Sequence, residues 1–246
     1  MCLIIAFWWG PFNYIEVKKL NKLAESGDGE ACWCLSGYYV GIKDEDESEY
    51  FLRRGALLGE PRSQYLVADI LMHKRDVKDI NDGLEYLEKS AMQEYADAQR
   101  TLGKLYWDGK LVSRNIVSPN LTLSEYWYRK AAYNGHEFAM YELSKILADT
   151  HSDKNNLIEA YKWLEIAVLR SNPKSAFYQD IAKQKISVIN KMTILGFDSL
   201  ALKNAAELVA KEEQLTIPKV PLISGGYFDD FWKRCKDKVR TKKAKG

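Results

Sequence analysis

The segment AQRTLGKLYWDG, residues 98–109, is followed at residues 124–135 by the segment SEYWYRKAAYNG. In the first segment a small residue opens an apolar helical run. The second places aromatic residues before a pair of alanines and a closing glycine. This two-part pattern recurs along the chain. Such self-similarity is typical of a stacked array, in which no single unit can bury its own apolar face. The sequence therefore predicts a repeat protein whose function resides on an extended surface.

The period of the array follows from the small residue that opens each first helix. Successive steps are 32, 35, 41 and 37 residues between Ala31, Ser63, Ala98, Ala139 and Ala176. A glycine stands four residues before three of these positions, where it suits a left-handed helix C-cap: Gly27, Gly59 and Gly135. Each second helix carries a small residue that would let neighbouring helices approach closely: Ala56, Ala91, Ala132 and Ala167.

The phrase AQRTLGKLYWDGKLV, followed by SEYWYRKAAYNGHEFA and EAYKWLEIAV, resembles the Sel-1-like repeats, which are related to tetratricopeptide repeats. The resemblance covers roughly residues 27 to 182. It implies an all-α, right-handed α-solenoid of helix-turn-helix repeats that binds other proteins. We expect an apolar N-terminal segment and lead-in at 1–20, the repeat solenoid with its C-terminal cap at 21–214, and an extended aromatic strip and basic tail at 215–246.

The first nine residues are apolar, but a helix needs about 20 such residues to cross a bilayer. No membrane-spanning segment is therefore expected. The segment also lacks the basic region and cleavage site of a secretory signal. Three interpretations stay open: the remainder of a longer leader, an apolar strip packed on the first repeat, or an anchor at a membrane surface. A missing or truncated leader would place the protein in the periplasm, and otherwise it would be cytoplasmic.

The sequence contains no recognisable catalytic or cofactor motif. Phosphate-binding, nucleophile-elbow, zinc-protease and dinucleotide-binding patterns are all absent. We expect no metal site and no cofactor, and the three histidines are expected to be structural or solvated: His73, His136 and His151. Four cysteines in 246 residues do not suggest a disulfide framework. Cys32 and Cys34 are poorly placed to pair with each other on one helix.

Charge is distributed unevenly along the chain. Residues 233–246 carry eight basic residues against one aspartate, a net charge of +7, so the other 232 residues carry −5. We expect a solvated terminus and no nucleic-acid partner, because no aromatic residues interleave the charges after Trp232. The acidic run at residues 44–49 is expected to begin a helix, where carboxylates accept backbone N–H groups and suit the macrodipole.

Most aromatic residues belong to the repeat pattern, and a recurring column predicts packing between units: Trp33, Tyr65, Arg100, Tyr141 and Tyr178. Aromatic residues outside that pattern are the better candidates for partner contact. In the third unit these candidates are Trp107, Tyr126 and Tyr133. In the C-terminal strip they are Tyr227, Phe228, Phe231 and Trp232. Pro218 and Pro221 favour an extended strip here, which either folds back on the solenoid or helps to hold a partner.

The stretch YFDDF at residues 227–231, after a proline-rich segment, resembles the end of certain bacterial Sel-1-like immunity proteins. Those proteins are encoded beside type VI secretion phospholipase effectors. The resemblance implies a non-enzymatic inhibitor that binds a toxic lipase-type effector and occludes it. A general adaptor that assembles signalling or envelope complexes is the first alternative, and an enzyme is the second. Repeats, cap and tail occupy the chain and leave no separate catalytic domain.

Overall fold

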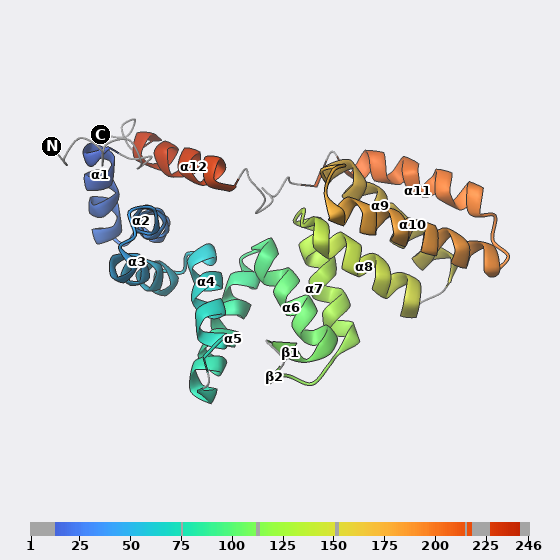
Figure 1. Cartoon of the computed structure of the whole chain (residues 1–246), viewed down its shortest axis with the longest axis horizontal. Coiled ribbons are helices and arrows are strands. Elements are labelled where there is room, and N and C mark those ends of the chain that lie inside the picture. The colour runs from blue at the N-terminus through green and yellow to red at the C-terminus, as the bar shows by residue number, and fades with distance from the viewer. Residues whose placement is uncertain are drawn as a thin grey trace. The chain divides into compact units, whose positions relative to one another are not determined.

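The computed structural model describes residues 13–74, 76–111, 114–150, 153–214, 216–217 and 227–241. Within these ranges the chain forms twelve α-helices and one short hairpin, which confirms the predicted all-α class (Figure 1). The helices divide between two compact units. Unit 1 combines residues 1–93 with 221–246, and unit 2 consists of residues 94–220. The predicted solenoid of 21–214 is thus shared between both units.

Unit 1 begins with a single helix and continues as two helical pairs. Its helices are α1 (Tyr14–Glu25), α2 (Gly29–Gly41), α3 (Glu45–Leu57), α4 (Pro61–Met72), α5 (Val77–Met92) and α12 (Tyr227–Thr241). Helix α2 packs on α3 and α4 packs on α5, while α1 and α12 both lie against α2. The C-terminal helix of the chain therefore belongs to the same unit as its first repeat.

Unit 2 continues the alternation of first and second helices and ends in two longer helices. Its elements are α6 (Ala96–Asp108), β1 (Lys110–Leu111), β2 (Arg114–Asn115), α7 (Leu121–Tyr133), α8 (Glu137–Thr150), α9 (Lys154–Arg170), α10 (Ala176–Ile194) and α11 (Ser199–Gln214). The two strands pair antiparallel, with Lys110 opposite Asn115. Helix α11 packs along α9, as expected of a capping helix.

The glycines that precede each repeat end a helix in the predicted way. Gly27, Gly59 and Gly135 have φ angles of 89°, 84° and 89°, the left-handed region that glycine adopts without steric cost. The residue after each glycine donates its N–H to a carbonyl five residues earlier, as His136 does to Ala131. This is the Schellman arrangement, which satisfies carbonyls at the helix end. The glycine positions and the repeat boundaries are confirmed together.

Small residues lie at the helix contacts that the repeat pattern assigned to them. The four alanines of the second helices are each at most 2% exposed: Ala56, Ala91, Ala132 and Ala167. Gly103 on α6 allows α7 to approach closely, since a Cβ atom there would lie 2.8 Å from the ring of buried Tyr128. Among the small residues that open the first helices, the fifth differs from the others. This residue, Ala176, is exposed at the start of α10. The periodic core thus extends through α9.

The acidic run at residues 44–49 begins a helix, as predicted. Asp44 is the N-cap of α3, and its side chain accepts a hydrogen bond from the backbone N–H of Glu47. Three further acidic residues occupy the first turn, where negative charge is favoured by the helix dipole.

The C-terminal segment corrects one expectation about the tail. Residues 227–241 form helix α12, whereas the sequence analysis expected an extended strip and a solvated basic tail. The two prolines precede this helix and do not restrict the backbone after residue 222. Within α12, apolar side chains recur every four residues at Phe231, Cys235 and Val239, and all three are buried. That spacing places them on one helical face, and this face explains the helix.

A disulfide joins Cys34 on α2 to Cys235 on α12, although no disulfide framework was expected from the cysteine count. The two residues are 201 positions apart in the sequence. Neither residue lies in a spacing motif, and only the fold brings them together. Cys32 remains a free, buried thiol, and burial raises its pKa above the usual value.

Candidate partner-binding surfaces

The three aromatic candidates of the third repeat lie on α6 and α7 with about half of their surface exposed. Trp107, at the end of α6, is 47% exposed, and Tyr126 and Tyr133 on α7 are 48% and 47% exposed. Tyr126 and Tyr133 are seven positions apart, which places them on the same side of the helix. Trp107 lies near the beginning of α7. Tyr106, the residue before Trp107, accepts a hydrogen bond at its carbonyl from the N–H of Asn120, the N-cap of α7. All three residues thus belong to one helical pair.

Neighbouring side chains hold the α7 aromatic residues in place. The Lys130 ammonium lies 5.5 Å from the centre of the Tyr126 ring, within the range of a cation–π contact. Tyr133 meets the buried Trp163 of α9 edge to face, with 5.0 Å between ring centres. Arg129 connects α7 to α9 through an ion pair with Glu159 of α9, and it also pairs with Glu125 on its own helix. The rings of Tyr126 and Tyr133 are therefore held in place on α7 while part of each stays exposed.

A second aromatic group lies on the first helices of unit 2 and was not singled out from the sequence. Phe138 of α8 stacks on Phe177 of α10 with 4.0 Å between ring centres, and Tyr141 meets Phe177 edge to face. Phe138 remains exposed. Sequence reasoning placed Tyr141 in the packing column but overlooked the two phenylalanines. They occupy different positions relative to Ala139 and Ala176, so no periodic signal marks them.

The C-terminal candidates lie on α12 in unit 1. Phe231 is only 8% exposed and meets Trp33 of α2 edge to face at 4.4 Å. Trp232 is half-buried and contacts Phe231 at the same distance. These two residues fold back on the chain, which was one of the two alternatives left open. Tyr227 and Phe228 begin α12, and their side chains lie outside the described part of the structure.

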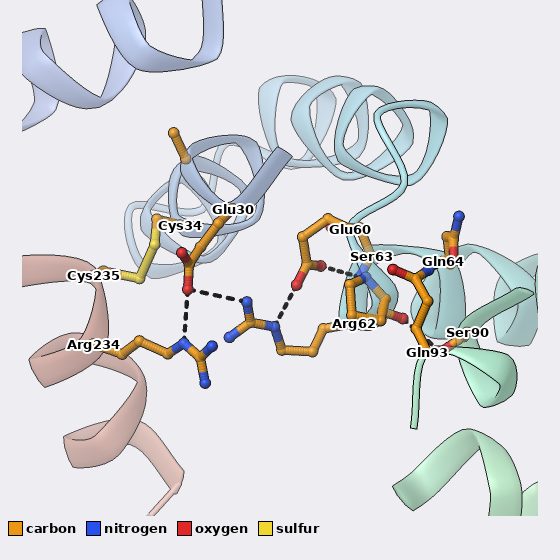
Figure 2. A network of polar contacts seen from close by, with 12 residues as sticks. Glu30, Cys34, Glu60, Arg62, Ser63, Gln64, Ser90, Gln93, Arg234 and Cys235 are labelled. Atoms are coloured by element: carbon orange, nitrogen blue, oxygen red, sulfur yellow. Dashed lines mark hydrogen bonds and ion pairs between the residues drawn. A yellow bond between two sulfur atoms is a disulfide. The ribbon is translucent and has the colours of Figure 1, made fainter. Parts of the chain in front are cut away.

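A polar network connects α12 to three other helices of unit 1 (Figure 2). At its centre Glu30 of α2 accepts from Arg234 Nε at 2.7 Å and from Lys238 Nζ at 2.9 Å, both on α12. Glu30 also pairs with Arg62 of α4 at 3.2 Å. The Arg62 guanidinium lies 3.9 Å from the centre of the Trp33 ring. Basic residues of the tail are thus partly engaged with the first repeat.

The network continues from α4 to α5. Glu60 caps α4 by accepting from the Ser63 N–H at 2.6 Å, and its other carboxylate oxygen holds Arg62. The Ser90 hydroxyl donates to the carbonyl of Pro61 at 2.7 Å, and a further hydrogen bond joins the side chains of Gln93 and Gln64. Polar contacts therefore run from the C-terminal helix through both helical pairs of unit 1 (Figure 2).

The charges around Glu30 change its acidity. Burial alone would raise the pKa of this carboxyl group, but hydrogen bonds from Arg234 and Lys238 outweigh burial and lower the pKa from 4.5 to about 2. Glu30 is therefore ionised over the whole physiological pH range. Asp28 adds a second carboxylate that pairs with Lys238 at 3.0 Å.

Two of the three histidines lie in the described residues, and they differ in burial. His136 is buried at the α7–α8 junction, with Nε2 3.3 Å from a carboxylate oxygen of Asp97. His73 is exposed at the end of α4, and His151 lies outside the described residues. In the described ranges no three His, Cys, Asp or Glu side chains are placed to hold a metal ion. The described helices also include none that is long and apolar enough to span a membrane.

The solved structures that match this chain include the following two. The crystal structure of a protective antigen present in uropathogenic Escherichia coli strains, which displays an SLR fold, aligns with a TM-score of 0.62 at 17% identity. That alignment covers 90% of this chain and 43% of the antigen. A Sel1 repeat protein from Oxalobacter formigenes aligns with a TM-score of 0.46 at 22% identity, covering 80% of this chain and 64% of that one. This chain thus spans less than two thirds of either structure.

A search of curated protein sequences finds no match to this chain. A sequence profile of the Sel1 repeat matches four successive segments: residues 22–60, 61–95, 96–136 and 138–172. Each segment includes one first helix and one second helix of the structure. Sel1 repeat proteins generally mediate protein–protein interaction, and they are typically non-catalytic scaffolds. The four matches cover more than half of the chain, which therefore belongs to the Sel1 repeat family.

Proposed function

We propose that this chain is a non-catalytic binding protein that inhibits a toxic protein partner by occluding it. The observation that carries the proposal is the group of half-exposed aromatic residues on α6 and α7: Trp107, Tyr126 and Tyr133. Aromatic side chains dominate the energy of protein interfaces, especially where the free protein already holds them in place. The contacts of Lys130 with Tyr126 and of Trp163 with Tyr133 supply that order for the two α7 residues.

The partner we propose is a lipase-type effector of an antibacterial type VI secretion system. This assignment rests on the YFDDF segment at residues 227–231, which resembles the end of immunity proteins against such effectors. Inhibition would be stoichiometric, because one chain covers the substrate entrance of one effector or blocks its engagement with a membrane. No catalytic group of this chain takes part.

An oxidising compartment suits the proposed role, and we assign the protein to the periplasm. The Cys34–Cys235 disulfide supports this location, because disulfides persist in the periplasm and are rare in the cytosol.

The experiment is a titration of the lipase activity of the effector with the purified protein and its variants. The wild type should abolish activity at equal proportion. Trp107→Ala and Tyr126→Ala should weaken inhibition by at least about tenfold, as expected for aromatic interface anchors. Ile194→Ala is the matched control, since Ile194 is an apolar residue of unit 2 that is 82% exposed. Equal inhibition by all three variants would remove α6 and α7 from the interface.

A general adaptor is the second candidate, and the aromatic group on α8 and α10 favours it. Phe138, Tyr141 and Phe177 form a group on helices other than α6 and α7, and an adaptor needs more than one binding surface. Co-purification of several envelope or signalling proteins without loss of lipase activity would support the adaptor and overturn the inhibitor.

A further inference from the structure

Helix α12 occupies a surface of unit 1 that is shaped to receive a helix. Phe231 projects over Gly37 of α2, where a Cβ atom would lie 2.1 Å from the ring carbon Cζ. Any other residue at position 37 would therefore displace the phenylalanine. The ring also meets Trp33 and Trp232, each at 4.4 Å. Glycine and Trp33 together form a socket for an aromatic side chain.

The same surface selects the charge of the helix that occupies it. Asp28 and Glu30 lie at the start of α2, and they pair with Arg234 and Lys238 of α12. Along α12 the socketed phenylalanine is followed after three residues by arginine and after seven by lysine, positions that share one side of a helix. An amphipathic helix with this order of aromatic and basic residues is complementary to α1 and α2.

A covalent bond holds α12 on this surface. The Cys34–Cys235 disulfide lies between the socket and the carboxylates, so a second helix cannot enter while the bond is intact. A dithiol reductant can open it by transferring two electrons and two protons, which leaves two protein thiols and converts the reductant to a disulfide. After reduction, α12 is a tethered competitor that can exchange with a helix from another molecule.

We propose that the face of α1 and α2 beneath α12 is a docking site for a basic amphipathic helix of a partner protein, that α12 occupies this site as an intramolecular ligand, and that the Cys34–Cys235 disulfide keeps it closed. This site belongs to unit 1, whereas the aromatic residues on which the proposed function rests belong to unit 2. Its test needs no effector, so each idea can fail without the other.

The test measures binding of a labelled synthetic peptide with the sequence of residues 227–241, in which Cys235 is replaced by Ala. The receptor is the full chain carrying Phe231→Ala and Cys235→Ser, which loses both the socketed ring and the disulfide. Saturable one-to-one binding to this receptor is expected, with none to the oxidised wild type. Reduced wild type should bind more weakly than the receptor, because its own α12 competes.

Two substitutions in the receptor distinguish specific binding at the socket from nonspecific binding of the peptide. Gly37→Leu fills the socket and should weaken peptide binding by at least about tenfold, as loss of an aromatic anchor does. Gly41→Ala is the matched control, because a Cβ atom at Gly41 on the same helix meets nothing within 4 Å. A peptide carrying Arg234→Glu and Lys238→Glu should also bind at least about tenfold more weakly to the unchanged receptor.

Several results would overturn the proposal. Failure of a folded receptor, checked by circular dichroism, to bind the peptide would do so, as would equal binding to oxidised wild type. Equal affinities of the Gly37→Leu and Gly41→Ala receptors would exclude the socket. If the Gly37→Leu receptor is unfolded, the charge-reversed peptide still tests the site on the receptor that carries only Phe231→Ala and Cys235→Ser. Conversion of reduced wild type to a dimer that exchanges α12 would identify a second copy as the occupant instead.

Discussion

Two glycines in helices illustrate how the surroundings of one residue decide the sign of a substitution. Gly103→Ala places a methyl group 2.8 Å from the buried Tyr128 ring, and the resulting overpacking should cost about 1–3 kcal/mol of the free energy of unfolding. Gly41→Ala adds a methyl group in open space and should gain up to about 1 kcal/mol through helix propensity. Urea unfolding of the two variants measures both changes. A gain for Gly103→Ala would mean that Tyr128 can move aside at no cost.

A second substitution tests the small residues of the repeat. Ala132 on α7 is fully buried, so Ala132→Trp should overpack the helix contact and destabilise the protein by about 1–3 kcal/mol or more. Trp107→Ala removes a side chain that is 47% exposed and should leave the melting temperature nearly unchanged. Thermal unfolding followed by circular dichroism compares the two. A large loss for Trp107→Ala, with partner binding intact, would make Trp107 a structural residue.

At the scale of single elements, the repeat helices could be predicted from the sequence, whereas α12 could not. Positions such as Gly135 and Ala132 recur in several units, and each recurrence strengthens the assignment of both residues. Helix α12 occurs once, so it has no second copy with which to compare it. Its apolar face is only three residues long, and one of the three is a cysteine whose partner is 201 residues away. Long-range pairing of this kind leaves no local signal.

Contacts between residues far apart in the sequence also limited the prediction of the candidate surfaces. Trp107, Tyr126 and Tyr133 lie outside the repeat pattern, and the structure leaves each about half exposed. The partner contact itself stays a prediction. Phe138 and Phe177 lie on different helices and meet only in the folded chain, so their stacking could not be read from spacing.

The docking of α12 should depend on pH through Glu30. Its pKa is lowered in the folded protein to about 2, so its contribution to stability is fully present above the unfolded value of 4.5. That contribution to stability is lost as the pH falls from 4.5 through about 2. Glu30→Gln cannot ionise and removes the effect. The difference in melting temperature between wild type and Glu30→Gln should be largest near neutral pH and should disappear below about pH 2. A difference that stays constant across this range would contradict the assignment.

At the scale of the whole molecule, the chain path makes unit 1 discontinuous. Residues 94–220 form unit 2 and are inserted between the helical pairs of unit 1 and its last helix. The Cys34–Cys235 disulfide joins the two parts of unit 1 and encloses all of unit 2 in its covalent loop. A cross-link over a long loop restricts the unfolded chain, although the size of the effect depends on how much structure remains when it is opened.

Reduction should therefore destabilise the two units unequally. Opening the disulfide removes a constraint within unit 1 and should cost that unit about 2–5 kcal/mol, while the helices of unit 2 keep their contacts. Hydrogen exchange measured by mass spectrometry, with and without a dithiol reductant, can follow each helix separately. Protection should fall in α1, α2 and α12 and stay unchanged in α8 and α9. An equal fall in all five helices would show that the units unfold as one cooperative body, and the disulfide would then stabilise the whole chain.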